Sequence, residues 1–448
     1  MYGIHFFIND GNLLFMGRKY FGTDGIRGRA GEFPLTPDFV LKLGAAAGSV
    51  FSSEVKRPVV LLAKDTRESC DMLEAALAAG LLSRGVAVEH LGILPTPAVS
   101  YLTKLLGANA GVMISASHNP YYDNGIKFFG PGGQKLSDDV ENEIEEALLE
   151  NKDIEKIATV RNHQEAERLY IDYLVKLGPR LDGLKIALDT ANGATYRVAV
   201  KVFQRLGAEV FAIFNTPDGR NINKGCGSTH PEALQHLVKE GEFDLGFAFD
   251  GDGDRVVMVD DRGRLAHGDY VLFINAVVRN ESGVVGTIMS NMALERALER
   301  RGIAFERAQV GDRYVFQRLV ERGWNLGGEQ SGHVLFMDRL QTGDGIQTAL
   351  LTIAALLKSG KSLAEWIDEM PMYPQVLLNV PVIDKQRAMR HGELPAWIAE
   401  AEEVIGDGRI NVRPSGTEPL VRVMAEGADE ELVKKAAEML ASRIAAIE

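Results

Sequence analysis

Short apolar runs alternate with helix-like segments three times along the chain. In each copy an apolar run leads into a polar loop, a helical pattern, a glycine and a second apolar run. This alternation is typical of β-α-β units, in which the glycine ends the helix. The wide, irregular spacing of the copies favours three α/β domains over one continuous sheet. The apolar runs are Val59–Ala63 and Val86–Val88, Lys185–Leu188 and Ala208–Phe214, and Val284–Met289 and Ile303–Val310.

The remaining pattern predicts approximate domain boundaries. Charged helical sequence at Leu136–Lys156 closes the first domain, and the helical pattern Glu165–Gly178 opens the second. Pro371, Pro374 and Pro381 separate the third domain from a small α+β domain. We expect that last domain to contain a helix near Pro395–Glu403, a strand at Val421–Ala425 and a closing helix at Asp429–Ile447. The predicted domains are 16–164, 165–268, 269–380 and 381–448, after an extension at 1–15.

The first residues, Met1–Phe15, fit neither this pattern nor a secretory signal. They are apolar but interrupted by polar residues, and they lack a basic start and a small-residue cleavage site. A second methionine, Met16, opens the strongly patterned segment. We therefore expect Met1–Phe15 to lie outside the fold rather than to add a strand.

Composition narrows the class of protein. The chain has 448 residues and a formal net charge of −13, and this acidity argues against a nucleic acid partner, which needs a basic face. No run reaches the about 18 uncharged apolar residues of a membrane-spanning helix. The only cysteines are Cys70 and Cys226, which suggests a reducing compartment, so we expect a cytoplasmic protein without a membrane partner.

The most informative motif, Asp250–Arg255, reads Asp-Gly-Asp-Gly-Asp-Arg. Asp250, Asp252 and Asp254 alternate after an apolar run, so they should lie together at the carboxyl end of a strand. Such hard oxygen ligands suit Mg²⁺ or Ca²⁺. An EF-hand loop does not fit, because it requires glycine where the chain has Arg255, and helices where the flanking sequence is strand-like.

A hydroxyl-rich loop, Ser-Ala-Ser-His-Asn-Pro, follows the apolar run Ala110–Ile114. A serine nucleophile needs an activating group, and His118 and Lys127 are candidate bases for Ser117. No glycines flank Ser117, so the loop is not a nucleophile elbow. Taken alone, the motif is better explained as a polar turn that Pro120 ends. Ser115, on the same loop, is expected not to be the nucleophile, so Ser115→Ala should keep much of the activity.

Two other motifs suit a phosphorylated ligand. The segment Arg413–Pro419 reads Arg-Pro-Ser-Gly-Thr-Glu-Pro, and together with Arg422 it offers charge, hydroxyls and free amides for a phosphate. The segment Phe21–Gly28 reads Phe-Gly-Thr-Asp-Gly-Ile-Arg-Gly, in which two glycines allow Arg27 to approach an anion closely. An ordinary turn is the alternative explanation of both segments.

One more polar motif, Gly327–His333, reads Gly-Gly-Glu-Gln-Ser-Gly-His. Glu329 and Ser331 alternate and would face one pocket, where they can hold sugar hydroxyls. His333 is a candidate base, although a single histidine is more often structural. The chain contains no Walker loop, G-x-G-x-x-G, C-x-x-C or H-E-x-x-H motif, so neither nucleotide nor zinc binding is supported.

The order of these motifs resembles that of the α-D-phosphohexomutase superfamily. The resemblance runs from about Met16 to the C-terminus. Gly22–Gly28 and Val310–Val315 resemble the branch that acts on glucosamine phosphates. The phosphomannomutase/phosphoglucomutase branch tends to begin with a Tyr-Asp-Ile-Arg-Gly type of motif instead, and it is the alternative.

The resemblance implies a heart-shaped fold with three related α/β domains, each with a mixed sheet, and a smaller C-terminal α+β domain. It implies that Ser117 carries a transferable phosphate and shares one Mg²⁺ with Asp250, Asp252 and Asp254. His118 and Lys127 would transfer protons, and Arg27 would steady the reacting phosphate. The substrate would be bound by Glu329, Ser331, His333, Arg255, Arg413, Ser415, Gly416, Thr417 and Arg422.

The implied activity is an isomerase reaction between glucosamine 6-phosphate and glucosamine 1-phosphate. It would pass through a sugar bisphosphate, which also acts as activator, on the route to UDP-N-acetylglucosamine and cell-wall precursors. The expected partner is a phosphosugar, and a homodimer is left open. A phosphoserine-bearing sensor without turnover and a Mg²⁺ phosphatase are the alternatives from other classes. The residue that selects the 2-amino group is not evident from the sequence.

Overall fold

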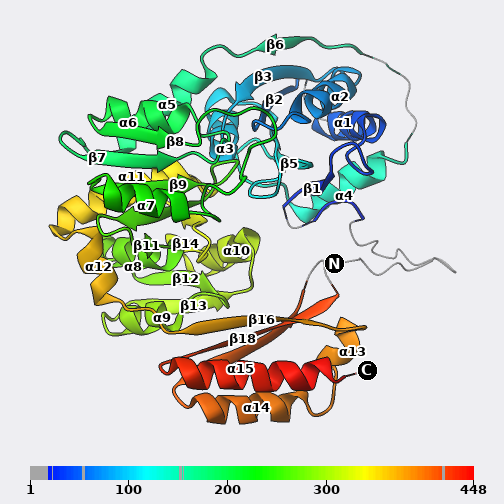
Figure 1. The fold of residues 1–448 in the computed structure, drawn as a ribbon. Coiled ribbons are helices and arrows are strands. Elements are labelled where there is room, and N and C mark those ends of the chain that lie inside the picture. The colour runs from blue at the N-terminus through cyan, green and yellow to red at the C-terminus, as the bar shows by residue number, and fades with distance from the viewer. Residues whose placement is uncertain are drawn as a thin grey trace.

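The computed structural model describes residues 19–22, 24–52, 56–150, 154, 156–415 and 419–447. The expected extension, Met1–Phe15, lies outside the described residues. Within them, four sheets follow one another along the chain, from the first domain in blue to the C-terminal domain in red (Figure 1). None of the helices in the described part of the chain combines the length and the apolar character that a membrane crossing requires.

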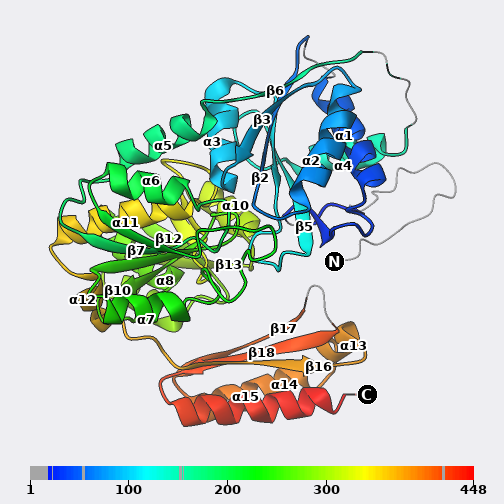
Figure 2. The same ribbon diagram turned by 45° about the horizontal axis from the view of Figure 1, so that its top comes forward.

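The first sheet lies between two helical layers. Its elements are β1 (Ile26–Arg29), α1 (Pro37–Ser52), β2 (Val59–Lys64), α2 (Cys70–Leu82), β3 (Ala87–Ile93), α3 (Thr96–Leu106), β4 (Ala110–Ile114), β5 (Asp123–Phe129), α4 (Asp138–Ala147) and β6 (Val160–Asn162). The strand order is β1-β5-β4-β2-β3-β6, in which β5 runs antiparallel to β1 and β4 and the other pairs are parallel. Side chains alternate along β2, so Val60 and Leu62 join the core beneath α1 and α2, while Leu61 and Ala63 join the core on the α3 side (Figure 2).

The second sheet presents the Asp-rich loop at a strand end. Its elements are α5 (Ala166–Leu177), β7 (Lys185–Asp189), α6 (Val198–Arg205), β8 (Glu209–Ile213), α7 (Glu232–Glu240), β9 (Leu245–Phe249), β10 (Val256–Asp260) and β11 (Leu265–Ala266). The order is β11-β10-β9-β7-β8, with β9 parallel to β7 and antiparallel to β10. Every residue of β9 and β10 is buried, so the loop between them is anchored on both sides.

The third sheet carries the Gly327–His333 motif in a tight connection between two strands. Its elements are α8 (Gly268–Arg279), β12 (Gly283–Thr287), α9 (Met292–Glu299), β13 (Ala304–Ala308), α10 (Asp312–Arg322), β14 (Leu326–Gly328), β15 (Val334–Phe336), α11 (Gly345–Ser359) and α12 (Leu363–Glu369). The order is β13-β12-β14-β15, and β14 pairs antiparallel with β15.

The last domain is a three-stranded antiparallel sheet covered on one face by two long helices (Figure 1). Its elements are β16 (Gln375–Pro381), α13 (Lys385–Met389), α14 (Leu394–Ile405), β17 (Gly408–Pro414), β18 (Leu420–Gly427) and α15 (Glu430–Ala445). The boundary expected at residue 381 is wrong, because β16 pairs with β18 along its whole length and so belongs to this last sheet. The prolines flank and end a strand here instead of marking a linker.

One hydrophobic cluster runs through the three α/β domains and includes Leu102, Tyr170, Phe249 and Phe273. The C-terminal domain has a cluster of its own, built around residues such as Leu440. The first three domains therefore share a core, whereas the fourth is a separate packing unit. The four-domain α/β fold expected from the sequence is confirmed.

The three β-α-β repeats are confirmed as β2-α2-β3, β7-α6-β8 and β12-α9-β13. The glycine after each helix has a left-handed backbone, with φ of 74° at Gly85, 103° at Gly207 and 70° at Gly302. Such angles favour glycine, which explains why the pattern was readable from the sequence.

The helical stretch expected at Leu136–Lys156 is only partly correct. Helix α4 ends at Ala147, and Lys156 forms an isolated parallel bridge with Arg84. The chain then continues into β6, which pairs with β3. Abundant charge resembles a helix surface, but after Ala147 the apolar spacing that would bind a helix to the domain stops.

Candidate active site

Ser117 lies on the loop that follows β4, facing the second domain. Its φ is 53°, a left-handed value that is unusual outside glycine and marks a constrained position. The residue is buried, and its Oγ donates a hydrogen bond to Asp250 Oδ2 at 2.6 Å. His118 Nδ1 lies 3.4 Å from the same Oγ. The structure thus brings the candidate nucleophile of one domain against the carboxylates of another.

Ser115 holds the loop in place. Its buried hydroxyl donates to Asp65 Oδ2 at 2.6 Å and accepts the backbone N–H of Ser117 at 2.9 Å. Alanine at this position would leave both partners short of a buried hydrogen bond, so the structure weighs against the prediction that Ser115→Ala keeps much of the activity.

The three aspartates of the Asp-rich loop converge at the end of β9. Asp250, Asp252 and Asp254 are buried, and each offers a carboxylate oxygen within 4.8 Å of the other two. Within the described part of the chain, Oδ1 of Asp252 and Oδ1 of Asp254 have no hydrogen-bond partner. Burial, together with the charges of Asp254 and Asp252, raises the pKa of Asp250. Clustered buried carboxylates with unused oxygens fit a divalent cation that prefers oxygen ligands.

Lys127 is a buried cation beside this cluster. Its Nζ lies 2.8 Å from Asp252, 3.7 Å from Asp254 and 3.0 Å from Asp24. Burial favours the neutral amine, but the three carboxylates outweigh it and raise the pKa of Lys127. Lys127 therefore carries a proton in this arrangement, which suits a proton donor better than the base considered from the sequence.

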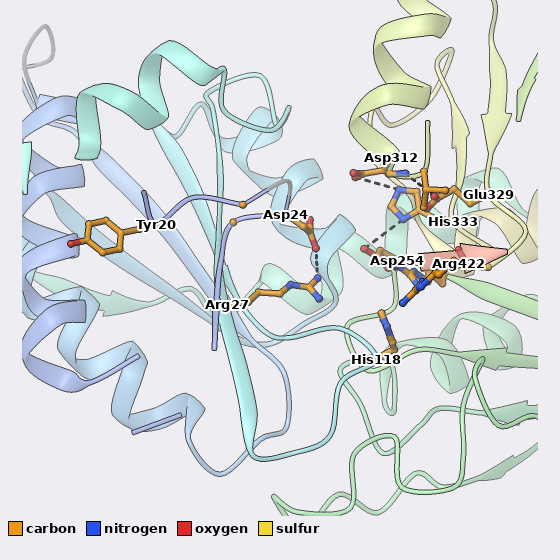
Figure 3. A pocket seen from close by; sticks show the side chains of 15 residues that line it. Tyr20, Asp24, Arg27, His118, Asp254, Asp312, Glu329, His333 and Arg422 are labelled. Atoms are coloured by element: carbon orange, nitrogen blue, oxygen red, sulfur yellow. Dashed lines mark hydrogen bonds and ion pairs between the residues drawn. The ribbon is translucent and has the colours of Figure 1, made fainter. Parts of the chain in front are cut away.

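A second cation extends the network into the third domain. Lys135 Nζ lies 2.7 Å from Asp24 and 2.6 Å from Asp312. His333 lies 3.7 Å from Asp312 and 3.6 Å from Asp254, and Figure 3 shows it between the two. Burial favours neutral imidazole, but Asp254 and Asp312 raise the pKa of His333. A ring of alternating charges thus joins three domains; its members are Asp254, Lys127, Asp24, Lys135, Asp312 and His333.

A cavity of about 620 Å³ opens beside this ring (Figure 3). All four domains contribute to its wall, including the C-terminal domain through Arg422. Its cations are positioned to attract an anionic ligand. The lining residues are Tyr20, Gly22, Asp24, Gly25, Arg27, His118, Asp254, Arg255, Val310, Gly311, Asp312, Glu329, Ser331, His333 and Arg422.

The sugar-binding candidates lie on the β14–β15 connection. Glu329 and Ser331 both line the cavity, as their alternation in the sequence predicted, and so does His333. Glu329 Oε1 accepts the backbone N–H of Gly311 at 3.0 Å, which ties this loop to the start of α10. This hydrogen bond therefore fixes the Glu329 side chain relative to the N-terminus of α10.

The C-terminal candidates lie on the β17–β18 hairpin. Arg413 and Arg422 are directly opposite each other in the antiparallel pair. Burial and the charge of Arg422 lower the pKa of Arg413. Like charges in this arrangement repel, so an anion bound between them would be stabilised. Ser415 is buried beside them, while Gly416 and Thr417 lie outside the described residues. Of the two arginines, the described cavity wall includes Arg422 but not Arg413.

His118 lines the cavity and is half-buried. Burial and the nearby charges of Arg255 and Arg27 lower its pKa to about 4. Neutral imidazole is the form that can accept a proton, but the lowered pKa makes it a weak base, so proton transfer by His118 stays a prediction. Arg27 also reaches the cavity, where it is paired with Asp24.

Sequence reasoning did not single out several residues of this site. Asp24 lies inside a recognised motif, but its turn-forming role concealed its contacts with Lys127 and Lys135. Asp312 lies within Val310–Val315, which was used only as a branch marker. Lys135 carried no signal, because its partners lie far away along the chain.

Comparisons with known proteins agree with this geometry. The chain matches the phosphoglucomutase/phosphomannomutase family in all four parts, with alpha/beta/alpha domain I at residues 18–155, domain II at 168–263, domain III at 267–373 and the C-terminal domain at 377–443. A phosphoglucosamine mutase of Thermus thermophilus is 62% identical over 431 residues, which cover 96% of this chain and 98% of that protein.

Solved structures show the same fold. A phosphoglucomutase/phosphomannomutase family protein from Burkholderia thailandensis has a TM-score of 0.79 at 25% identity, covering 94% of this chain and 96% of that one. An Aspergillus fumigatus N-acetylphosphoglucosamine mutase, solved with GlcNAc-6P and magnesium, has a TM-score of 0.64 at 17% identity, covering 95% of both chains. On these matches and on the order of its motifs, the chain belongs to the phosphoglucomutase/phosphomannomutase family within the α-D-phosphohexomutase superfamily.

Proposed function

We propose that the chain is a phosphoglucosamine mutase that interconverts glucosamine 6-phosphate and glucosamine 1-phosphate through phosphorylated Ser117. The observation that carries this proposal is the 2.6 Å contact between Ser117 Oγ and Asp250, inside a cluster of buried carboxylates beside a four-domain cavity. The choice of sugar is supported by the 62% identical relative of that name. Such an enzyme would act in the cytoplasm, in the synthesis of UDP-N-acetylglucosamine and cell-wall precursors.

The carboxylate cluster would hold Mg²⁺. Asp250, Asp252 and Asp254 supply hard oxygen ligands, and two of their oxygens accept no hydrogen bond from the described residues. A phosphate on Ser117 would complete the set from the opposite loop. Bound there, the ion would neutralise charge on the transferring phosphoryl group.

Each turnover would involve two phosphoryl transfers, of two different phosphoryl groups. A sugar hydroxyl oxygen bonds to phosphorus as the bond to Ser117 Oγ breaks, and the hydroxyl proton passes by way of His118 or Lys127 to the serine oxygen. The resulting sugar bisphosphate reorients in the cavity. Its other phosphoryl group is then transferred to Ser117 Oγ as the bond to the second sugar oxygen breaks. The serine proton passes to that second sugar oxygen, and the isomer is released.

The cavity wall would have to bind a phosphosugar in both orientations. Arg422, with Arg413 and the hairpin around Ser415, would bind the phosphate that is not reacting. Arg27 would steady the reacting phosphate, and Arg255, which also lines the cavity, would bind the substrate. The substrate hydroxyls would be bound by Glu329, Ser331 and His333.

A substrate comparison tests the choice of sugar. Glucosamine 6-phosphate should give a higher kcat/KM than glucose 6-phosphate or mannose 6-phosphate in parallel coupled assays. Equal or better use of glucose or mannose phosphate would favour phosphoglucomutase/phosphomannomutase activity instead. Steady release of inorganic phosphate would indicate a phosphatase, and binding without turnover would indicate a sensor.

Replacement of the serine tests the mechanism. Purified wild-type protein should carry phosphate on the peptide that contains Ser117, and a sugar bisphosphate should raise both that fraction and the activity. Ser117→Ala should lose the phosphate and nearly all turnover. Ser442→Ala, on the exposed face of α15, is the matched control and should keep both. Substantial turnover by Ser117→Ala would refute the proposed function.

A further inference from the structure

The backbone carbonyl of Ser117 accepts two side-chain hydrogen bonds from residues that have no role in the proposed chemistry. Arg67 Nη2 donates at 2.9 Å and Asn223 Nδ2 donates at 2.8 Å. Arg67 belongs to the β2–α2 loop of the first domain, and Asn223 to the β8–α7 loop of the second. Two domains therefore hold the same atom of the candidate catalytic residue.

Arg67 is committed entirely to this loop. It is 2% exposed, and each of its five side-chain N–H groups has an acceptor. The fork closes on backbone oxygens instead of facing the cavity, so its charge is not available to the substrate. The acceptors are Asp65 Oδ2 at 2.8 Å, the carbonyls of Ser117 and Asn119 at 2.9 Å each, the carbonyl of Asp123 at 3.1 Å, and the carbonyl of Pro120.

Asn223 repeats this arrangement from the second domain. Its Nδ2 also donates to the carbonyl of Asn119 at 3.1 Å, and its backbone N–H donates to Ala191 at 2.9 Å. Its φ is 57°, so the residue is itself held in a left-handed turn. Because it belongs to the domain of the Asp-rich loop, it fixes the serine loop relative to the carboxylates.

We propose that Arg67 and Asn223 are positioning residues for phosphoryl transfer, which fix the Ser117 carbonyl from two domains and thereby keep its Oγ directed at the carboxylate cluster. This proposal rests on the proposed function. A peptide unit is planar, so holding the Ser117 carbonyl also limits rotation of the backbone around that residue. The left-handed φ of 53° is then maintained against the more favourable right-handed region.

The position of Ser117 Oγ would affect both half-reactions of the proposed mutase. The same oxygen must donate the phosphoryl group in one half-reaction and receive it in the other, so both directions depend on one geometry. Misplacement of a reacting atom by about 1 Å can cost about 10²-fold in rate. Substrate binding depends on the cavity wall, to which neither Arg67 nor Asn223 contributes in the described structure. Loss of either residue should therefore lower kcat and leave KM nearly unchanged.

Two substitutions test the proposal with the full-length protein. Asn223→Gly removes the side chain and keeps the left-handed backbone, which glycine adopts freely. Arg67→Lys retains the charge opposite Asp65 but cannot reach all the carbonyls with one ammonium group. We expect kcat with glucosamine 6-phosphate to fall about 10-fold for Asn223→Gly and about 10²-fold for Arg67→Lys, with KM within about twofold of wild type.

Matched controls separate positioning from a general loss of stability. Asn280→Gly replaces an asparagine with a φ of 55° at the exposed end of α8. Arg264→Lys alters an arginine that donates to Asp260, Asp368 and the Ala364 carbonyl, away from the cavity. Both controls should keep wild-type kcat even where their melting temperature falls.

The phosphate content of the Ser117 peptide provides a second readout. After incubation with a sugar bisphosphate, Asn223→Gly should reach the wild-type phosphorylated fraction more slowly, whereas the controls should match wild type. A folded Asn223→Gly variant with wild-type kcat and phosphorylation rate would overturn the proposal. If Arg67→Lys does not fold, the result for Asn223→Gly alone tests the proposal. If wild-type Ser117 is never phosphorylated, the proposed function itself fails, which is a distinguishable result.

Discussion

Gly251 separates the aspartates of the carboxylate cluster and packs directly against the serine loop. A Cβ added there would lie 2.5 Å from the carbonyl oxygen of Ser117, 2.8 Å from Nδ2 of Asn223 and 2.9 Å from Cδ1 of Ile222. The backbone of Gly251 is not left-handed, so alanine meets no conformational penalty and the effect of Gly251→Ala is steric. This substitution therefore tests how closely the two loops must approach.

The expected effects of Gly251→Ala on stability and kcat follow from the distance between the added Cβ and the Ser117 carbonyl oxygen. An unstrained carbon–oxygen contact is about 3.3 Å or longer, so the carbonyl, which would be 2.5 Å away, must retreat by about 0.8 Å. Arg67 and Asn223 hold that carbonyl and oppose the shift. Overpacking of this kind costs about 1–3 kcal/mol. A displacement approaching 1 Å at the nucleophile should lower kcat by about 10- to 10²-fold.

The assay combines turnover with stability. We expect Gly251→Ala to show the reduced kcat in a coupled glucosamine 1-phosphate assay and a free energy of unfolding lowered by about 1–3 kcal/mol. Gly392→Ala is the matched control, because no atom lies within 4 Å of its added Cβ and its φ is not left-handed. Wild-type kcat and stability in Gly251→Ala would show that the loops do not need this close approach, and would refute the reasoning.

Three other predictions follow from the same geometry. Asp252→Asn should weaken Mg²⁺ binding and reduce turnover by several orders of magnitude with the fold intact, as measured by Mg²⁺ titration of activity and by circular dichroism; wild-type activity would exclude it as a ligand. Lys135→Met should remove the ion pairs to Asp24 and Asp312 that join the first and third domains. We expect KM to rise while the melting temperature changes little, and an unchanged KM would contradict this. Burial raises the pKa of Asp344 to about 6 from 3.8. The folded state thus keeps a proton that the unfolded state loses, so this group's contribution to stability is full below about pH 4 and is lost as the pH rises through 6. Denaturation of Asp344→Asn should lack that decline, and parallel pH profiles would refute the assignment.

The parts of the fold that could be predicted depend on local signals. The β-α-β repeats combine apolar strands with glycines that need left-handed angles, and both leave a trace within a few residues. The carboxylate cluster was predictable for a similar reason, because Asp250, Asp252 and Asp254 come from one loop whose geometry the flanking strands impose. The charged sequence after Ala147 led to the incorrect prediction that the helix continues to Lys156. Charged surface sequence alone does not show whether a helix has an apolar face that packs against the domain.

The ring of charges could not be predicted, because its members come from three domains. Lys135 and Asp24 are 111 residues apart, and each looks like an ordinary exposed charge in its own segment. Asp312 begins a helix, a position where an acidic residue needs no further explanation. Only the shared core of the first three domains brings these side chains together.

Arg67 illustrates a deeper limit. Its partners in the serine loop are backbone carbonyls, which every residue type provides, so nothing in the side chains of that loop signals an arginine 50 residues earlier. The sequence around Arg67 does not indicate a buried arginine either, because Asp65 and Arg67, two residues apart, look like a surface ion pair. In the structure both side chains are buried, and Asp65 orients the Arg67 guanidinium, which donates hydrogen bonds to the carbonyls of the serine loop. Sequence motifs identify the groups that contact the substrate. The groups that hold those motifs in place are recognised in the structure, from the acceptors to which buried side-chain donors are hydrogen-bonded.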